Sequence, residues 1–213
     1  MRRHTLQESG TIHMKRLLFD VSTNVMYVAY ARDEILVDFS IRIATRDHAK
    51  YLVDRIDQVL KRNKVSLDQI DEIIIGHGPG SYTGIRIAVV VGKMLAYTKK
   101  IPLKVISSLY FMTSGYEGKV AACIDARRGF VFSAIYENGH VLLEDTYLKL
   151  ADLYTIEAFK NAQTVIIDDR NYEINIKRII EHSTYVEHIH DLEPNYLRKT
   201  EAETNHDQKS DIK

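Results

Sequence analysis

The sequence predicts an α/β protein with two lobes, in which mixed sheets are flanked by helices and the second lobe is the smaller. The first observation is a short β-branched run at Ile73–Ile75, followed by a glycine loop at Gly76–Gly84 and a helical apolar repeat from Ile85. The second is that two groups of strand-like runs, before this loop and after residue 118, each lead into helical segments. The chain has 213 residues, 45% of them hydrophobic, which is enough to bury a core in each of two small lobes.

The first lobe is expected over residues 14–117 and opens with strands. Three strand-like runs come first: Arg16–Asn24, Val25–Tyr30 and Ile35–Ile43. The short turn at residues 32–34 favours an antiparallel meander. Asp20, Ser22 and Thr23, at the end of the first run, allow two interpretations. They contact a nucleotide phosphate or its metal, or they bond the backbone of the turn.

Two long helices are expected in this lobe. The first covers residues 47–64, and its apolar stripe consists of Leu52, Val53, Ile56, Val59 and Leu60. The second covers about residues 81–97 and carries Ala88, Gly92 and Ala96 on one face. Because a glycine inside a helix costs about 1 kcal/mol relative to alanine, something must pack close to Gly92. The protein's own sheet and a helix of another subunit are both open as its neighbour.

The glycine loop also has two interpretations. Its candidate site residues are Gly78, Gly80, Ser81, Thr83 and Gly84. In the first interpretation, the loop amides and the helix N-terminus form an anion site for phosphate. In the second, the glycines make a tight turn and let another surface approach closely. The loop is neither a Walker A motif nor a dinucleotide fingerprint, since no Gly-Lys-Ser/Thr ends it and Ser81 and Thr83 stand where a third glycine is needed.

The second lobe is expected over residues 118–198. Its strand-like runs are Val120–Ile124, Phe130–Tyr136, Val141–Tyr147 and Thr164–Ile167. Asn138 and Gly139 form a strong hairpin signal, and helices are expected near residues 150–160 and 174–182. Residues 1–13 are interpreted as a leader of cloning origin or a disordered segment, and residues 199–213 as a polar, disordered tail.

Composition excludes several classes of protein. The single cysteine, Cys123, lies in an apolar run, which argues against a disulfide framework and indicates a cytoplasmic protein. No run approaches the roughly 18 apolar residues of a membrane span, so no membrane association is expected. The formal net charge is zero, whereas phosphate neutralisation supplies much of the affinity of RNA-binding proteins. We therefore expect this chain to bind tRNA weakly when it is alone.

Several motifs, taken together and in this order, resemble the TsaB (YeaZ) family. They are Phe19–Thr23, the helix opening at His48, Gly76–Arg86, Ile101–Pro102 with Ser107–Leu109, Asp125–Gly129 and Glu193–Arg198. The resemblance runs from Met14 to about Arg198. It implies a two-lobed fold of the actin, sugar kinase and Hsp70 type, called ASKHA.

The resemblance also implies a function. Family members take part in making threonylcarbamoyladenosine, the modified base beside the anticodon of tRNAs that read codons beginning with adenine. It implies a scaffold subunit without catalysis of its own, which docks on and activates the catalytic subunit TsaD, while the ATPase TsaE joins the complex. We expect no cofactor on this chain alone, ATP or ADP only at the junction with partner subunits, and tRNA only through the complex.

In the family, the partner surface is built largely from the first two long helices. Carried onto this chain, the resemblance assigns that surface to Leu52, Ile56, Ala88, Gly92 and Ala96. It gives Gly92 a reason, because small side chains let partner helices approach closely. The same surface implies a homodimer when the partner is absent.

The residues leave a second function open. It is an ATP-binding phosphotransferase of the same fold that uses Asp20, Ser22 and the Gly78–Gly84 loop. No catalytic residue and no metal site are assigned. The histidines His182, His188 and His190 lack the His-x-x-x-His spacing of the catalytic relative. Whether the isolated protein binds or turns over ATP distinguishes the two functions.

Overall fold

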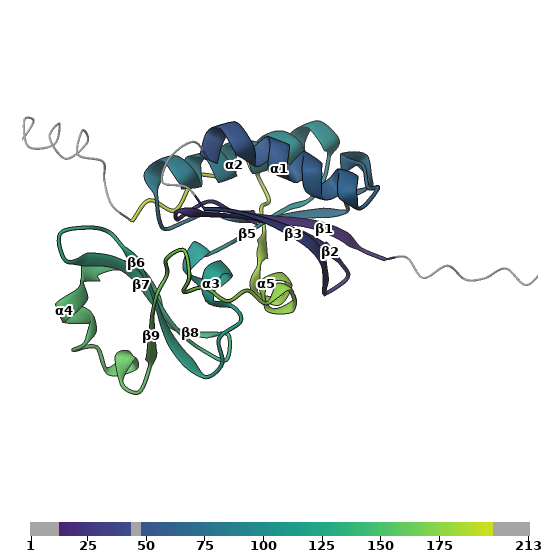
Figure 1. Ribbon diagram of the computed structural model, residues 1–213. Helices are drawn as coiled ribbons and strands as arrows, with labels where there is room; N and C mark the ends of the chain where they lie inside the picture. Colours follow the sequence, from purple (N-terminus) through teal and green to yellow (C-terminus); the bar gives the residue numbers. More distant parts are fainter. Residues whose placement is uncertain (1–12, 44–47, 198–213) are drawn as a thin grey trace, which may run out of the picture.

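The structure is a computed structural model that describes residues 13–43 and 48–197. The expected leader and tail therefore lie almost wholly outside the described residues. Two sheets lie one above the other, and two long helices cover the outer face of the upper sheet (Figure 1). Within the described ranges, no helix is long and apolar enough to cross a bilayer.

The first sheet has six strands. They are β1 (Lys15–Asp20), β2 (Val25–Arg32), β3 (Ile35–Ile43), β4 (Glu72–Gly76), β5 (Leu103–Ile106) and β10 (Thr184–Tyr185), in the order β10-β5-β4-β1-β2-β3. β1, β4 and β5 are parallel, whereas β2, β3 and β10 run antiparallel to their neighbours. The predicted meander of the first three strands is confirmed.

The two predicted long helices are also confirmed. α1 (His48–Arg62) and α2 (Tyr82–Lys99) lie on one face of the sheet, and a short 3-10 helix, η1 (Leu67–Gln69), precedes β4 (Figure 1). α1 buries Leu52, Ile56, Val59 and Leu60 against β2 and β3. Val53 is 48% exposed instead of buried with them. It lies at the margin of the stripe, about 100° around the helix from Leu52.

The second sheet has four strands in the order β8-β7-β6-β9. They are β6 (Lys119–Asp125), β7 (Phe130–Glu137), β8 (His140–Lys149) and β9 (Gln163–Ile166). Asn138 and Gly139 both have positive φ and form the predicted hairpin turn. The helix expected over residues 150–160 is only one turn, α4 (Leu150–Leu153), followed by η2 (Glu157–Phe159). It ends where the Thr155 N–H and hydroxyl both bond back to the Asp152 carbonyl.

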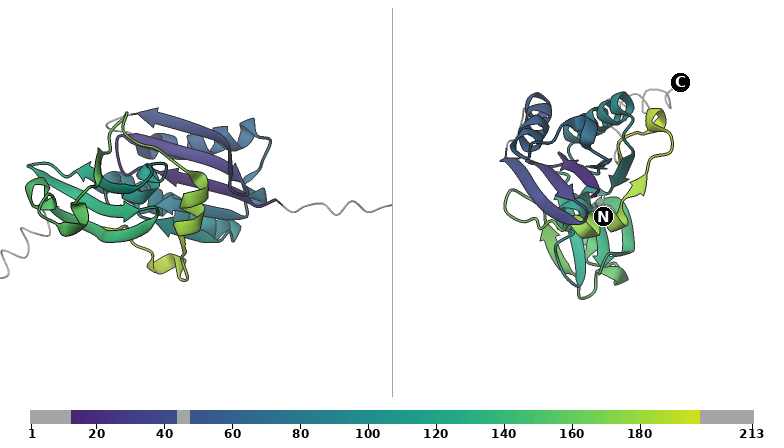
Figure 2. Two further views of the ribbon diagram at one scale, coloured as in Figure 1. Left: turned by 90° about the horizontal axis from the view of Figure 1, so that it is seen from below. Right: turned by 90° about the vertical axis from the view of Figure 1, so that its right-hand side faces the viewer.

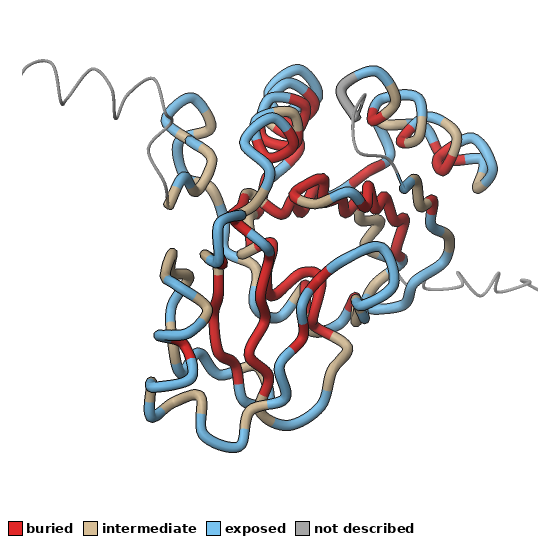
Figure 3. The backbone as a smooth tube through the Cα atoms, turned by 60° about the vertical axis from the view of Figure 1, so that its left-hand side comes forward, coloured by how far each residue is buried: buried red, intermediate tan, exposed pale blue. Residues whose placement is uncertain are grey.

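α3 (Ser108–Thr113) lies between the sheets, and α5 (Ile176–His182) lies beneath the first sheet, beside the second (Figure 1). Leu109 and Phe111 of α3 are fully buried in one apolar cluster with residues of both sheets. Figure 2 shows the two lobes from two further directions, and Figure 3 shows that the buried stretches are concentrated in the strands. The lobes therefore share a packed core around α3.

The sequence suggested that the segment after α5 belongs to the second lobe. In the structure this segment returns to the first lobe. β10 pairs with β5, and Val186, Ile189 and Leu192 pack against the core beneath α1 and α2. The short helix η3 (Ile189–Asp191) lies beside α2. The expected extent of the second lobe, residues 118–198, is thus corrected. Apolar side chains around residue 189 find their core on the first sheet.

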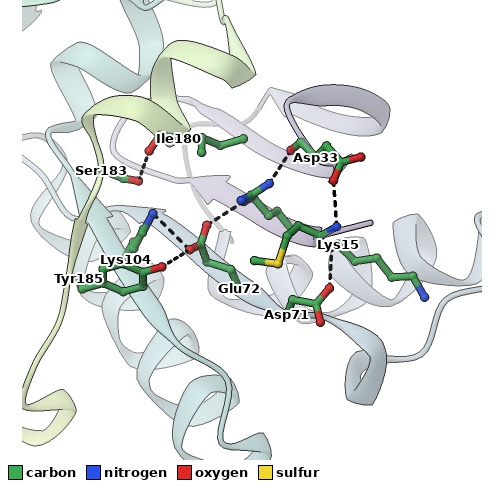
Figure 4. Close-up of polar contacts among 10 residues, drawn as sticks. Lys15, Asp33, Asp71, Glu72, Lys104, Ile180, Ser183 and Tyr185 are labelled. Carbon is green, nitrogen blue, oxygen red and sulfur yellow. Dashed lines mark hydrogen bonds and ion pairs between the residues drawn. The ribbon is translucent and has the colours of Figure 1, made fainter. Parts of the chain in front are cut away.

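A buried charged group ties this returning segment to the sheet. The Glu72 carboxylate accepts hydrogen bonds from Arg16 Nε (2.8 Å) and the Tyr185 hydroxyl (3.0 Å), and it pairs with Lys104 Nζ at 3.2 Å (Figure 4). Burial alone would raise the pKa of Glu72, but the bonds from Arg16, Tyr185 and Lys104 outweigh it and lower the pKa. Two cations thus stabilise the buried anion on three adjacent strands.

Candidate functional site: the inter-lobe cleft and the outer face of α2

The glycine loop joins β4 to α2 and packs tightly on the turn between β1 and β2. The Ser81 N–H donates to the Ser22 carbonyl at 2.7 Å. A side chain at Gly80, which has φ +155°, would collide with that carbonyl, and one at Gly84 would collide with the Val21 carbonyl. These contacts favour the second interpretation of the loop, in which glycines permit the close approach of another backbone.

Asp20 lies directly beneath this loop and is fully buried. Its carboxylate accepts from the Ser22 N–H (2.8 Å), the Ser22 hydroxyl (2.6 Å) and the Ser108 hydroxyl (2.5 Å). Burial raises the pKa of Asp20, and the bonds from Ser108 and Ser22 oppose that shift. Of the two interpretations of Asp20 and Ser22, the structure favours bonds within the turn over a nucleotide contact, because both residues are buried and bonded to each other. These residues and the tightly packed loop do not fit a role in holding nucleotide phosphates.

Ser108 extends this hydrogen-bonded group to the loop itself. Its hydroxyl accepts from the Gly78 N–H at 3.0 Å, and its own N–H donates to the Gly78 carbonyl at 2.8 Å. Gly78 has φ +114°, a conformation that glycine adopts without strain. The start of α3 thus holds the loop and the buried acid in one position. Thr83 is exposed at the cleft, where it follows the N-cap residue Ser81.

A cleft of about 990 Å³ lies between the two lobes. One wall comes from residues 22–24 and 80–83 of the first lobe, and the other comes from residues 124–128 and 166–168 of the second. Asn195, Tyr196 and Leu197 of the returning segment also line it. The Tyr196 ring stacks on Tyr82 with centroids 4.8 Å apart. The cleft is therefore built from segments far apart in the sequence.

The charged side chains of the cleft are balanced. Arg127 and Arg128 follow β6 in the left-handed conformation, with φ of 67° and 56°, and both are exposed. Asp125 accepts from the Arg127 N–H at 2.9 Å. On the neighbouring segment, the N–H groups of Arg170 and Asn171 lower the pKa of Asp168. Two cations and two anions therefore line this wall.

The residues that the resemblance assigned to a partner surface lie inside the protein. Leu52, Ile56, Ala88 and Ala96 are buried in the core between the helices and the first sheet. A Cβ on Gly92 would lie 3.0 and 3.2 Å from two methyl carbons of Ile75. The protein's own sheet therefore explains the glycine, and assigning these five residues to a partner contact is corrected. They face inward because that side of each helix covers the sheet.

The outward side of α2 is apolar as well. Val90, Met94 and Tyr97 recur at intervals of four and three residues and are 61%, 47% and 62% exposed. Lys93 holds the returning segment against this helix, since its Nζ donates to the carbonyls of His190 (2.8 Å) and Leu192 (3.0 Å). The His190 ring lies 4.9 Å from Tyr97 in an edge-to-face contact. The exposed stripe thus stands on a firmly packed helix.

The histidines singled out in the sequence do not come together. His182 packs edge-to-face on Tyr110, whereas His190 packs on Tyr97 of α2. No three His, Cys, Asp or Glu side chains are close enough to hold a metal ion in residues 13–43 and 48–197. The sequence analysis did not predict that two polar residues near the cleft, Asp145 and Asn195, interact with each other. Asn195 falls in a motif of the resemblance, but Asp145 has no local signal.

Comparison with known proteins decides the family. The family model described as "TsaD: tRNA N6-adenosine threonylcarbamoyltransferase" matches residues 41–181, more than half of the chain. The chain belongs to the TsaD family. Among curated relatives, it is 30% identical over 146 residues to the "tRNA threonylcarbamoyladenosine biosynthesis protein TsaB" of Bacillus subtilis, covering 65% of this chain and 64% of the relative. It is 33% identical over 134 residues to the protein of the same name from Escherichia coli, covering 59% and 58%.

The chain thus spans less than two thirds of the length of these curated TsaB relatives. Two solved structures share the fold of this chain. YeaZ from Pseudomonas aeruginosa superposes with a TM-score of 0.67 at 22% identity, covering 86% of this chain and 100% of YeaZ. A structure titled as similar to peptidase YEAZ from that organism gives 0.68 at 24% identity, with 87% and 100% covered. The predicted resemblance to TsaB (YeaZ) and the reduced ASKHA fold are confirmed.

Proposed function

We propose that this chain is a non-catalytic scaffold subunit in the synthesis of tRNA threonylcarbamoyladenosine. It docks on a TsaD-like transferase and stabilises the active form of that partner. The names of the curated relatives support the biosynthetic role. The observation that carries the docking proposal is the exposed stripe of Val90, Met94 and Tyr97 on α2.

This stripe has the properties of a contact surface. Large apolar side chains that stay exposed in a row on one helix mark interaction sites more often than scattered ones do. The helix is held from below by the core and from the side by Lys93, so little order is lost on binding. Val53 of the neighbouring helix α1 is also exposed, at 48%.

Further parts of the proposal come from the resemblance to the TsaB (YeaZ) family. A second copy of the chain uses it when the transferase is absent, so a homodimer and the mixed complex compete. A TsaE-like ATPase joins the assembly, ATP or ADP binds at the junction of subunits, and tRNA is held through the complex. The formal net charge of zero supports weak tRNA binding by this chain alone.

The phosphotransferase remains the alternative. A phosphotransferase needs a carboxylate that is free to contact a nucleotide or its metal, and the geometry of Asp20 does not fit that role. That carboxylate is fully buried beneath the glycine loop and accepts three hydrogen bonds from serines. The scaffold is therefore the better supported function.

Light scattering after size exclusion tests the proposal, with this protein mixed with its cognate TsaD-like subunit. Val90→Asp places a charge in the stripe, and Val141→Asp is the matched control, since Val141 is a similarly exposed valine on β8. We expect the mixed complex with wild type and Val141→Asp and its loss with Val90→Asp. An undiminished complex with Val90→Asp would place the contact elsewhere. If wild type forms no complex, calorimetric titration with ATP tests the alternative.

A further inference from the structure

Asp145 links the two lobes at a point behind the cleft. It belongs to β8 of the second lobe, and its Oδ1 accepts from the Ser107 hydroxyl of the first lobe at 2.7 Å. Its Oδ2 accepts from Asn195 Nδ2 at 3.0 Å. The Tyr136 hydroxyl adds a longer bond to Oδ1 at 3.3 Å. One carboxylate thus receives donors from three separate segments.

The donors are themselves fixed to the first lobe. Ser107 follows β5 directly and is the N-cap residue of α3. Asn195 lies in the segment of residues 192–197, which we call the C-terminal strap. The Asn195 N–H donates to the His77 carbonyl of the glycine loop at 2.8 Å, and its carbonyl lies against Gly78. Asp145 therefore holds the second lobe to both the start of α3 and the glycine loop.

Two consecutive serines of the first lobe form hydrogen bonds to carboxylates of different lobes. Ser108 bonds Asp20 of the first lobe, while Ser107 bonds Asp145 of the second. Asp145 is partly buried, and desolvation raises its pKa against the bonds from Ser107 and Tyr136. A partly buried carboxylate loses free energy when its donors are removed, so this group favours a single relative position of the lobes.

The cleft itself has no such tie. Among the hydrogen bonds of the described residues, none joins residues 22–24 or 80–83 to residues 124–128 or 166–168 across it. The lobes share the apolar core around α3, which can serve as a hinge, because apolar contacts lack the directionality of hydrogen bonds. The width of the cleft thus depends on contacts at its rear.

We propose that Asp145 is an inter-lobe lock. With its carboxylate bonded to Ser107 and Asn195, the lobes hold one cleft width. When the bond to the strap is lost, the second lobe swings about α3 and the cleft widens. The lock acts on the shape of this chain, and it does not depend on the scaffold function proposed above.

Exchanging the partners tests the lock. Asn195→Asp places two carboxylates face to face and breaks the bond. Adding Asp145→Asn restores a donor and an acceptor, since the new amide at position 145 donates to the new carboxylate at position 195 and accepts from Ser107. Asp145→Asn alone can turn its amide to keep the strap bond, so it should resemble wild type. A merely structural role of Asn195 would not be rescued by a change at residue 145.

The measured quantity is the distance across the cleft. Spin labels at Asn24→Cys and Arg128→Cys, on opposite walls and both exposed, report it by pulsed electron resonance in a Cys123→Ala background. We expect one narrow distribution for wild type, a longer and broader one for Asn195→Asp, and the narrow one again for the double variant. Unchanged distances in Asn195→Asp, or a widening that Asp145→Asn does not reverse, would overturn the lock. If Asn195→Asp does not fold by circular dichroism, Ser107→Ala replaces it, with partial widening expected and an unchanged distance counting against the lock.

Discussion

The carboxylate of Asp20 lies directly against the α-carbon of Gly76, so that any side chain at Gly76 would collide with it. The same added Cβ would also lie 2.8 Å from the Ser108 hydroxyl. Gly76 is the last residue of β4 and begins the glycine loop. The absence of a side chain there is what lets the buried acid, the serine and the loop occupy one small volume.

Gly76→Ala should therefore destabilise the fold by about 3 kcal/mol, because overpacking a rigid core costs that much when the neighbours cannot move. Chemical denaturation gives the free energy of unfolding. Gly129→Ala is the matched control: it has φ +76° but open space around its α-carbon. It should lose only about 1 kcal/mol from backbone strain. Equal losses for the two variants would mean that Asp20 can move aside.

Gly92 leads to a graded prediction. In Gly92→Ala, the new methyl group crowds Ile75 at 3.0 Å, but alanine gains about 1 kcal/mol of helix propensity, so stability should change little. Gly92→Leu cannot fit between α2 and the sheet and should cost several kcal/mol. Thermal unfolding of both variants checks this order. A folded, stable Gly92→Leu would show that the residue does not face the sheet.

The first sheet should also show a pH dependence that passes through Glu72. Its pKa is lower in the folded state than in the unfolded chain, so its contribution to stability is present above the unfolded pKa and is lost as the pH falls through the folded one. Glu72→Gln leaves Arg16 and Lys104 without their anion and should cost about 3 kcal/mol at pH 7. Unfolding by urea between pH 7 and pH 3 should show the difference from wild type shrinking on the acid side. A difference that stays constant with pH would mean that the charge of Glu72 does not matter.

The structure shows which features a sequence can predict. β3 follows from a β-rich run with a short turn before it, and α2 follows from an apolar repeat after a glycine loop, because both signals are local. The inward direction of Gly92 could not be chosen, since both sides of α2 carry apolar residues. Only the position of Ile75 on the sheet decides which side is the core.

The polar group around Asp145 could not be predicted from the sequence for a different reason. Asp145 and Asn195 are separated by 50 residues, and their bond exists only because the chain returns to the first lobe after α5. Asp20 was singled out from the sequence, but its hydrogen bond from Ser108, which lies 88 residues away, could not be predicted. Residue type thus indicates where chemistry can occur, whereas long-range packing decides whether a side chain is free to perform it.

The free edge of the first sheet is protected by Arg62. β3 is an edge strand with Ile35, Phe39 and Ile43 at least 47% exposed, a pattern that invites pairing with another chain. Arg62 donates to both oxygens of Asp38 and to the Phe39 carbonyl, all at 3.0 Å, while Asp38 accepts from the Phe39 N–H at 2.8 Å. The backbone groups of Phe39 are therefore occupied by side chains.

Arg62→Ala should uncover this edge and cause self-association that grows with concentration. Sedimentation velocity measures it best in the Val90→Asp background, which removes the proposed association through α2. Lys61→Ala is the neighbouring control: Lys61 pairs with Asp57 on its own helix at 2.8 Å, and the variant should leave the sedimentation unchanged. If Arg62→Ala and Lys61→Ala sediment alike at every concentration, Arg62 does not protect the exposed apolar edge of β3.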